Sequence, residues 1–145
     1  MSAVSAADLA PPAGFEPFDR KSPLTEPWEP IFCRRSTEKV VLGLWAREPH
    51  LNSRGMIHGG LIAALADNAM GHSCGAVMLA AGNKPAGGLV TVSLSVDYIG
   101  AAKQGQWIEF DTRYVKTGRT LCFAQCFVLA DGEVIARADA RFKVM

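Results

Sequence analysis

One aspartate of this 145-residue chain lies where a charge is unfavourable. Asp67 is in the middle of GGLIAALADNAMGHSCGAVM, residues 59–78, a segment of mostly small and apolar side chains. A carboxylate in apolar surroundings needs a hydrogen bond or an opposite charge. Asp67 could therefore bond a neighbouring backbone amide or serve a partner helix, or it could act as a general base or nucleophile in an apolar pocket.

The residues before this segment could supply an oxyanion hole. In the stretch NSRGMIHGG, Asn52 lies in a loop, and His58 is followed by Gly59 and Gly60 where a helix should begin. A helix N-terminus presents unpaired N–H groups, and a glycine lets a carbonyl oxygen approach one closely. Asp67 is eight residues beyond Gly59, about 12 Å along a helix. This spacing indicates a site shared by two subunits with antiparallel helices.

The elements that position these residues follow from the periodicity of the sequence. Residues 38–48 predict a strand, and residues 59–78 predict a helix that is apolar on nearly every side and therefore enclosed by the rest of the protein. Residues 89–100 alternate between apolar and polar side chains, which would put Thr91 on the polar face of a strand. Residues 106–144 predict three more strands with turns at KTGR and ADGE. An α+β fold, with an antiparallel sheet wrapped around one long central helix, fits this order better than a sandwich.

We expect one domain preceded by an arm. The chain is 49% apolar, which suits a single domain with a sizeable core. Residues 1–30 contain six of the eight prolines, and these forbid a continuous helix or a central strand there. The arm is therefore assigned to residues 1–30 and the domain to residues 31–145.

Composition argues against several functions. The 15 Lys and Arg nearly balance the 14 Asp and Glu, so we expect neither nucleic acid nor a membrane as the partner. The four cysteines match no zinc pair, and His50 and His72 have no matching ligand set, so we expect no metal. The N-terminus has no basic start and no continuous apolar run, which makes a cytoplasmic protein the simplest interpretation.

The motif around Asp67 resembles a known family. Asn-x-x-Gly, then His-Gly-Gly, then Asp67 is similar to the pattern of the hot-dog-fold thioesterases, specifically the phenylacetate-pathway (PaaI-like) acyl-CoA thioesterases. The resemblance extends over about residues 40–143. It implies a hot-dog fold and hydrolysis of acyl-CoA to a free acid and CoA, with no cofactor besides the CoA of the substrate. It also implies a homodimer at least, paired again into a tetramer.

The resemblance assigns roles to five residues. Asp67 would activate water or attack the thioester carbonyl, and the backbone N–H of Gly59 would bind the thioester oxygen. Asn52 would position or polarise that carbonyl, His58 would shape the same loop, and Thr91 would orient the attacking water. Asn52, His58 and Gly59 would come from one subunit, with Asp67 and Thr91 from the other.

Other residues are expected to contact the substrate. The apolar helix residues suit an acyl group, and we assign this contact to Gly60, Leu61 and Met70, with Ala64 and Leu65 nearby. The resemblance implies that the turn of Lys116, Gly118, Arg119 and Thr120 meets the pantetheine and nucleotide of CoA. Two alternatives are left open: an acyl-thioester hydratase or dehydratase, whose usual signature is absent, and a non-catalytic acyl-CoA-binding protein.

Overall fold

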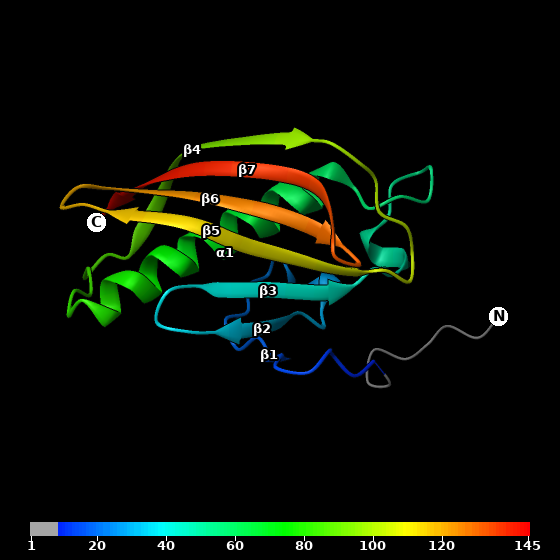
Figure 1. The fold of residues 1–145 in the computed structure, drawn as a ribbon, viewed down its shortest axis with the longest axis horizontal. Helices are drawn as coiled ribbons and strands as arrows, with labels where there is room; N and C mark the ends of the chain where they lie inside the picture. The colour runs from blue at the N-terminus through cyan, green and yellow to red at the C-terminus, as the bar shows by residue number, and fades with distance from the viewer. Residues whose placement is uncertain (1–8) are drawn as a thin grey trace.

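One long helix packs against one antiparallel sheet in the computed structural model, which describes residues 9–145 (Figure 1). The elements in chain order are β1 (Glu16–Pro17), the 3-10 turn η2 (Glu26–Trp28), β2 (Phe32–Arg35), β3 (Val40–Trp45), the 3-10 turn η3 (Glu48–His50), α1 (Gly59–Ala80), β4 (Leu89–Tyr98), β5 (Trp107–Thr117), β6 (Leu121–Ala130) and β7 (Glu133–Val144). The sheet order is β1-β2-β3-β5-β6-β7-β4, so β4 lies at one edge. The predicted α+β architecture is confirmed.

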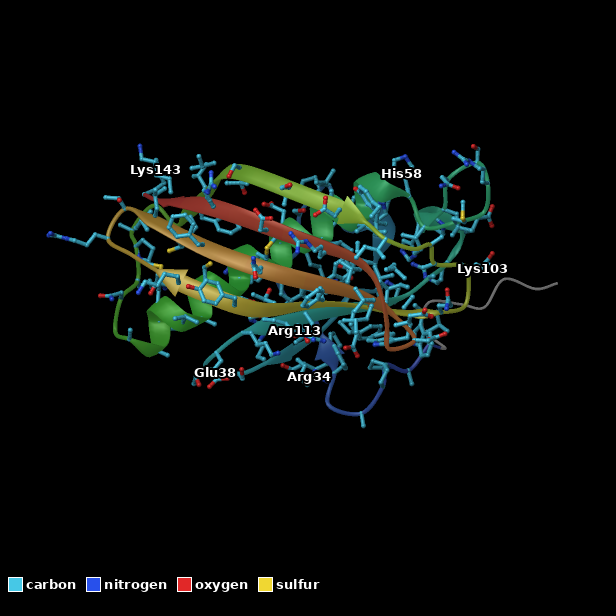
Figure 2. All side chains as sticks on the ribbon, turned by 45° about the horizontal axis from the view of Figure 1, so that its top comes forward. Arg34, Glu38, His58, Lys103, Arg113 and Lys143 are labelled. Atoms are coloured by element: carbon cyan, nitrogen blue, oxygen red, sulfur yellow. The ribbon has the colours of Figure 1, made fainter. Side chains whose placement is uncertain are left out.

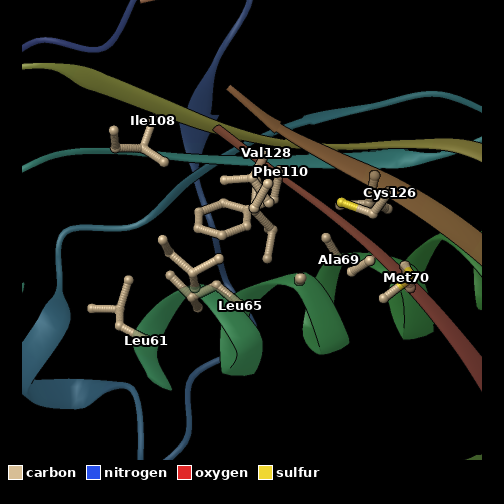
Figure 3. Close-up of a cluster of buried hydrophobic side chains, with 14 of the residues drawn as sticks. Leu61, Leu65, Ala69, Met70, Ile108, Phe110, Cys126 and Val128 are labelled. Atoms are coloured by element: carbon tan, nitrogen blue, oxygen red, sulfur yellow. The ribbon is translucent and has the colours of Figure 1, made fainter. Parts of the chain in front are cut away.

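The core lies between the sheet and one face of α1. Leu61, Leu65 and Met70 of the helix belong to one buried cluster with Phe110 and Val128 of the sheet, and Leu65 lies close to Phe110 (Figure 3). Each such side chain stabilises the fold by about 1.5–3 kcal/mol relative to an exposed position. The opposite face of α1 carries Asp67, Gly71 and Gly75 and is only partly covered. The expectation that the rest of the protein encloses the helix is therefore wrong within one chain, because positions such as Asp67, Gly71 and Gly75 are only partly buried.

The described part of the N-terminal arm covers the other end of the sheet. β1 is the outermost strand and pairs with β2. Phe18 is buried in the main core, whereas Phe15 packs edge to face on Trp107 in a smaller cluster. β2 was not predicted, because four residues are too few to reveal a period. Residues 1–8 lie outside the described residues, and the domain boundary at residue 31 stays a prediction.

A register shift in β4 turns Thr91 toward the helix. Thr91 lies opposite the buried Phe142 of β7, and after the shift Ser93 lies opposite the exposed Arg141. Residues directly opposite each other share a face of the sheet. Thr91 is thus on the helix side and Ser93 on the outer side. The prediction that Thr91 lies on the polar face is wrong, because strict alternation fails across a β-bulge.

Among residues 9–145, no helix is both long enough and apolar enough to cross a membrane.

Candidate active site

The N-terminus of α1 is built by His58 and the two glycines after it. His58 is the N-cap residue, and its Nδ1 accepts a hydrogen bond from the Gly60 N–H at 2.8 Å. The His58 N–H in turn donates to the backbone oxygen of His50 at 2.9 Å. Figure 2 shows His58 at the opposite end of the molecule from Lys143. The Gly59 N–H has no acceptor within residues 9–145, so it is free to bind a ligand oxygen.

Both glycines lie in close contact with aromatic rings. A Cβ on Gly59 would be 3.2 Å from Cζ of Tyr98, and a Cβ on Gly60 would be 3.0 Å from Nδ1 of His58. Both distances are tighter than ordinary van der Waals contact. The His-Gly-Gly motif therefore fixes the first turn of the helix through close contacts that a side chain would disturb.

Asn52 organises the loop that leads into this turn. Its Oδ1 accepts hydrogen bonds from the N–H groups of Arg54, at 2.9 Å, and Met56, at 3.2 Å. The Asn52 N–H also donates to the Met56 oxygen at 2.7 Å. The side-chain nitrogen of Asn52, Nδ2, has no acceptor among residues 9–145. This nitrogen is the part of the side chain that could polarise a carbonyl.

The loop is anchored behind Asn52 by a buried histidine. His50 is 1% exposed, its Nδ1 accepts from the Arg47 N–H, and its Nε2 lies 2.9 Å from the Trp28 oxygen. The neutral tautomer with a proton on Nε2 satisfies both contacts. Burial lowers the pKa of His50, with a smaller contribution from the Arg47 guanidinium, while the Trp28 hydrogen bond raises it. His50 thus holds the loop in a neutral form.

Asp67 and Thr91 meet at the middle of the helix. The Thr91 hydroxyl donates to Oδ1 of Asp67 at 2.8 Å. Asp67 is half-buried and Thr91 is exposed. The carboxylate thus has a hydrogen-bond partner from β4, and its second oxygen has no protein donor within residues 9–145. Asp67 and Thr91 were predicted to act from the same subunit, and they are in contact within one chain.

A cavity of about 720 Å³ begins at this pair and follows the open face of α1. The helix contributes Asp67, Asn68, Gly71, His72, Gly75, Ala76 and Leu79, and other segments contribute Arg20, Arg35, Val40, residues 83–89, Thr91 and Phe142. A Cβ on Gly75 would meet nothing within 4 Å. Small residues spaced four apart from Asp67 therefore leave this cavity unfilled.

Several lining residues were missed by the sequence analysis. Asn68, His72, Arg20 and Arg35 all border the cavity. The helical spacing from Asp67 could have indicated Gly71 and the positions beside it. The two arginines gave no such signal, because they belong to segments without a clear period.

His72 lies where the arm covers the cavity. Its ring packs edge to face on Phe18, with centroids 5.1 Å apart. Burial lowers the pKa of His72, and the guanidinium groups of Arg20 and Arg35 lower it further, against a small opposing effect of Asp19. The neutral form of the imidazole is therefore favoured beside the two guanidinium groups.

A second cavity of about 620 Å³ lies beyond the C-terminal end of α1. Gly118 and Arg119 line it together with Lys84, and Asn83, Lys84 and Pro85 also border the first cavity. Lys116 and Thr120 are exposed and do not line either cavity. Half of the predicted CoA-binding turn is thus at a cavity adjoining the Asp67 site.

The predicted acyl contacts on α1 are not brought to the cavity. Leu61 is 3% exposed and Met70 is 0% exposed, and both belong to the core. Gly60 is exposed beside His58 but does not line the cavity. These residues are on the parts of the helix that face the sheet or the capping loop, whereas the cavity follows the face of Asp67 and Gly75. Leu61 and Met70 do not line this cavity, and their contact with substrate stays a prediction.

The cysteines offer no alternative nucleophile. All four are free and buried. Burial raises the pKa of Cys74 and of Cys126 to about 12, so both thiols are protonated at neutral pH. Among residues 9–145, no group of three or more His, Cys, Asp or Glu side chains could hold a metal ion.

One chain holds two separate groups of candidate residues, here called half-sites: Asp67 with Thr91, and Gly59 with His58 and Asn52. Asp67 lies eight helical residues, about 12 Å, from Gly59, and Thr91 contacts Asp67 from β4. Gly59, His58 and Asn52 do not line the cavity that holds Asp67. Within one chain these two groups therefore do not converge on a common point.

Comparison with known proteins gives consistent matches in sequence. A model of the thioesterase superfamily matches residues 54–136. The Pseudomonas aeruginosa protein named "Putative esterase PA0474" is 36% identical over 132 residues, covering 90% of this chain and 95% of that protein. Human acyl-coenzyme A thioesterase 13 is 33% identical over 101 residues, covering 68% of each.

Solved structures also match over most of the chain. A mutant of the phenylacetic acid degradation protein PaaI from Thermus thermophilus has a TM-score of 0.72 at 22% identity, covering 86% of this chain and 100% of that one. At this identity the match shows the fold alone. The Streptococcus mutans protein smu.793, bound to acetyl CoA, has a TM-score of 0.64 at 25% identity, covering 74% and 82%.

Proposed function

Because the chain belongs to the thioesterase superfamily, we propose that it hydrolyses acyl-CoA thioesters at a site shared by two copies. The predicted hot-dog fold is confirmed, and so is the class of enzyme, a thioester hydrolase. The observation that carries the proposal is the hydrogen bond from Thr91 to Asp67 at the mouth of the cavity along α1. This hydrogen bond fixes the direction of the Asp67 carboxylate beside the unfilled cavity.

In the proposed reaction Asp67 acts as a general base, or as the nucleophile itself. As a base it takes a proton from water, whose oxygen bonds to the thioester carbonyl carbon. Thr91 fixes one carboxylate oxygen and leaves the other free to face the water. Collapse of the intermediate breaks the carbon–sulfur bond and releases CoA thiolate, which takes up a proton. As a nucleophile, Asp67 would form an acyl anhydride that water then hydrolyses.

The negative oxygen of the intermediate would be bound at the other half-site. The Gly59 N–H at the helix N-terminus has no protein acceptor within residues 9–145, and the helix dipole favours negative charge there. A donor of this kind typically contributes about 10²–10³ in rate. Asn52, through its free amide nitrogen, is the second proposed donor.

The edge strand β4 supports a dimer that joins the half-sites. Its outer edge pairs with no strand among residues 9–145, and the β4 residues Val90, Val92 and Leu94 are exposed. A long apolar edge strand is a surface for pairing with another chain. Antiparallel pairing with a second copy, about a twofold axis near the middle of β4, would bring the Thr91 end of one strand beside the Tyr98 end of the other.

This pairing would complete the site. Thr91 contacts Asp67, and Tyr98 donates to the backbone oxygen of Gly59 at 2.6 Å. In such a dimer the Thr91 end of one β4 lies beside the Tyr98 end of the other. Asp67 of one copy therefore approaches Gly59 of the other. The tetramer and the absence of any cofactor stay predictions.

The second cavity is the proposed place for part of CoA. Lys84 and Arg119 could bind its phosphates, since charge-assisted hydrogen bonds to phosphate are strong. The acetyl CoA bound to the Streptococcus mutans relative supports this class of ligand. The acyl group would then extend along the cavity beside Gly71 and Gly75.

The test is thiol release from acetyl-, hexanoyl-, palmitoyl-, phenylacetyl- and hydroxybenzoyl-CoA. We expect the wild type to hydrolyse at least one of them, and Asp67→Asn to lose at least about 100-fold in kcat/KM while staying folded. Thr91→Val should lose about three- to tenfold, and the matched Thr91→Ser, which keeps the hydroxyl, should not.

Four outcomes would contradict the proposal. No thiol release by the wild type, with acyl-CoA still bound, would identify a non-catalytic binder. A hydrated acyl-CoA as the product would identify a hydratase. Full activity of Asp67→Asn would return this aspartate to a structural role. Sedimentation of the active protein as a monomer would refute the shared site.

A further inference from the structure

Tyr98 binds the one turn of the helix that the proposed chemistry depends on. It is the last residue of β4, and its hydroxyl donates to the Gly59 oxygen at 2.6 Å. Its ring also lies on Gly59, within 3.3 Å of where a Cβ would be. The register places Tyr98 opposite the buried Ala136, on the helix side of the sheet. The end of the edge strand is thereby tied to the start of α1.

The peptide group between Gly59 and Gly60 is held at both ends. Its carbonyl oxygen accepts from Tyr98, and its N–H donates to Nδ1 of His58 at 2.8 Å. Hydrogen bonds in such a chain polarise and strengthen one another. The Gly59 N–H belongs to the preceding peptide group, whose oxygen accepts from the Leu61 and Ile62 N–H groups. The two peptide groups meet at the Gly59 Cα, so holding the second group restricts rotation about that Cα and limits the directions that the Gly59 N–H can take.

We propose that Tyr98 is a positioning residue of the active site, which aims the Gly59 N–H by clamping the adjoining peptide group together with His58. This inference rests on the proposed function, because it concerns the donor to the thioester oxygen. It assigns Tyr98 a role through Gly59 and not a contact with the reacting atoms. Besides pairing, β4 would then position both Asp67, through Thr91, and Gly59, through Tyr98.

The chain contains a matched control for this contact. Its only other tyrosine, Tyr114, also lies in a strand, and the two are similarly exposed, at 54% for Tyr114 and 52% for Tyr98. The Tyr114 hydroxyl has no hydrogen-bond partner among residues 9–145. Replacing each tyrosine by phenylalanine removes one hydroxyl from a half-exposed ring, and only one of the two hydroxyls is bound.

The experiment compares Tyr98→Phe and Tyr114→Phe in the full chain. We expect Tyr98→Phe to lower kcat by about three- to tenfold, with KM changed by less than about twofold. The hydrogen-exchange rate of the Gly60 amide should rise by a similar factor, while the midpoint of thermal unfolding stays the same. Tyr114→Phe should match the wild type in all of these measurements.

A double-mutant cycle separates positioning from general support of the fold. If Tyr98 acts through the clamped peptide group, Tyr98→Phe should cost less than about twofold in a His58→Ala background, because the clamp is already open at its other end. Equal losses in both backgrounds would overturn the proposal.

Failure of the inference and failure of the proposed function give different results. Wild-type kcat and Gly60 exchange in Tyr98→Phe, with Asp67→Asn inactive, would overturn the role of Tyr98 and leave the thioesterase site intact. No hydrolysis of any acyl-CoA by the wild type would overturn the proposed function, and with it the catalytic consequence of Tyr98. Faster Gly60 exchange would then still demonstrate the clamp itself.

Discussion

The two faces of α1 differ in the size of their side chains and in what they contact. One face carries Leu61, Leu65 and Met70, which are packed against the sheet. The other carries Asp67 and Gly75, which border an unfilled cavity. Both faces belong to the same 22-residue helix. A single element therefore provides the core of the fold on one side and the candidate site on the other.

This difference explains how the helix tolerates its glycines. A glycine within a helix costs about 1 kcal/mol relative to alanine, and Gly71 and Gly75 both lie within α1. Each large residue buried on the opposite face contributes about 1.5–3 kcal/mol. Burial of side chains on the packed face thus offsets the cost of the glycines on the open face. Mutations on the two faces should consequently change different properties.

The strongest test of this separation is Leu65→Ala. Leu65 is 1% exposed, and removing three buried carbons should lower the free energy of unfolding by about 2–5 kcal/mol. Gly75→Ala on the open face should raise it by up to about 1 kcal/mol, because its Cβ meets nothing. Urea unfolding at one fixed protein concentration measures both. Similar losses in the two variants would show that the faces are not separate.

The sequence predicted the elements of the two faces but not which residues lie on each. The helix, β3, β4 and the hairpins of β5 to β7 follow from periodicity and turn residues. Because α1 is apolar all round, periodicity could not show which side meets the sheet. Leu61 and Met70 were therefore assigned to the substrate, although they fill the core.

Site residues could be predicted from the sequence where the residue type itself carries information. The charge of Asp67 in an apolar segment indicated a site, and the glycines after His58 indicated a helix start. The bulge that turns Thr91 inward could not be foreseen, because it depends on the pairing of β4 with β7. Tyr98 was missed for the same reason: its contact with Gly59 joins residues 39 positions apart.

Filling the open face should change substrate preference rather than stability. Gly75→Leu would add a side chain in the cavity that we propose for the acyl group. We expect kcat/KM for palmitoyl-CoA to fall by at least about tenfold, with that for acetyl-CoA changed by less than about threefold. Thiol release over a series of chain lengths measures this. Gly75→Ala is the matched control and should keep the wild-type preference.

The opposite result would move the acyl group elsewhere. If Gly75→Leu lowers activity equally on all chain lengths, the cavity beside Gly75 holds a part that all substrates share, such as pantetheine. If it changes no activity, the substrate does not enter this cavity. In either case the two faces would still differ in stability.

The smallest expected effect comes from His72, where the arm covers the open face. Burial and the charges of Arg20 and Arg35 lower its pKa below the ordinary 6.5, against a small effect of Asp19. Below about pH 6.5 the unfolded chain therefore binds a proton at His72 that the folded chain does not. Acidification consequently favours unfolding, and stability that is complete above this pH is lost as the pH falls.

The measurement is the free energy of unfolding between pH 7.5 and pH 5. His72→Gln should reduce its dependence on pH by up to about one proton, and Arg20→Gln should reduce it by less, because burial is the larger cause. Some dependence should persist in His72→Gln, since burial also lowers the pKa of His50. An unchanged slope in His72→Gln would mean that the arm does not bury this ring in solution. The open face of α1 would then be open along its whole length.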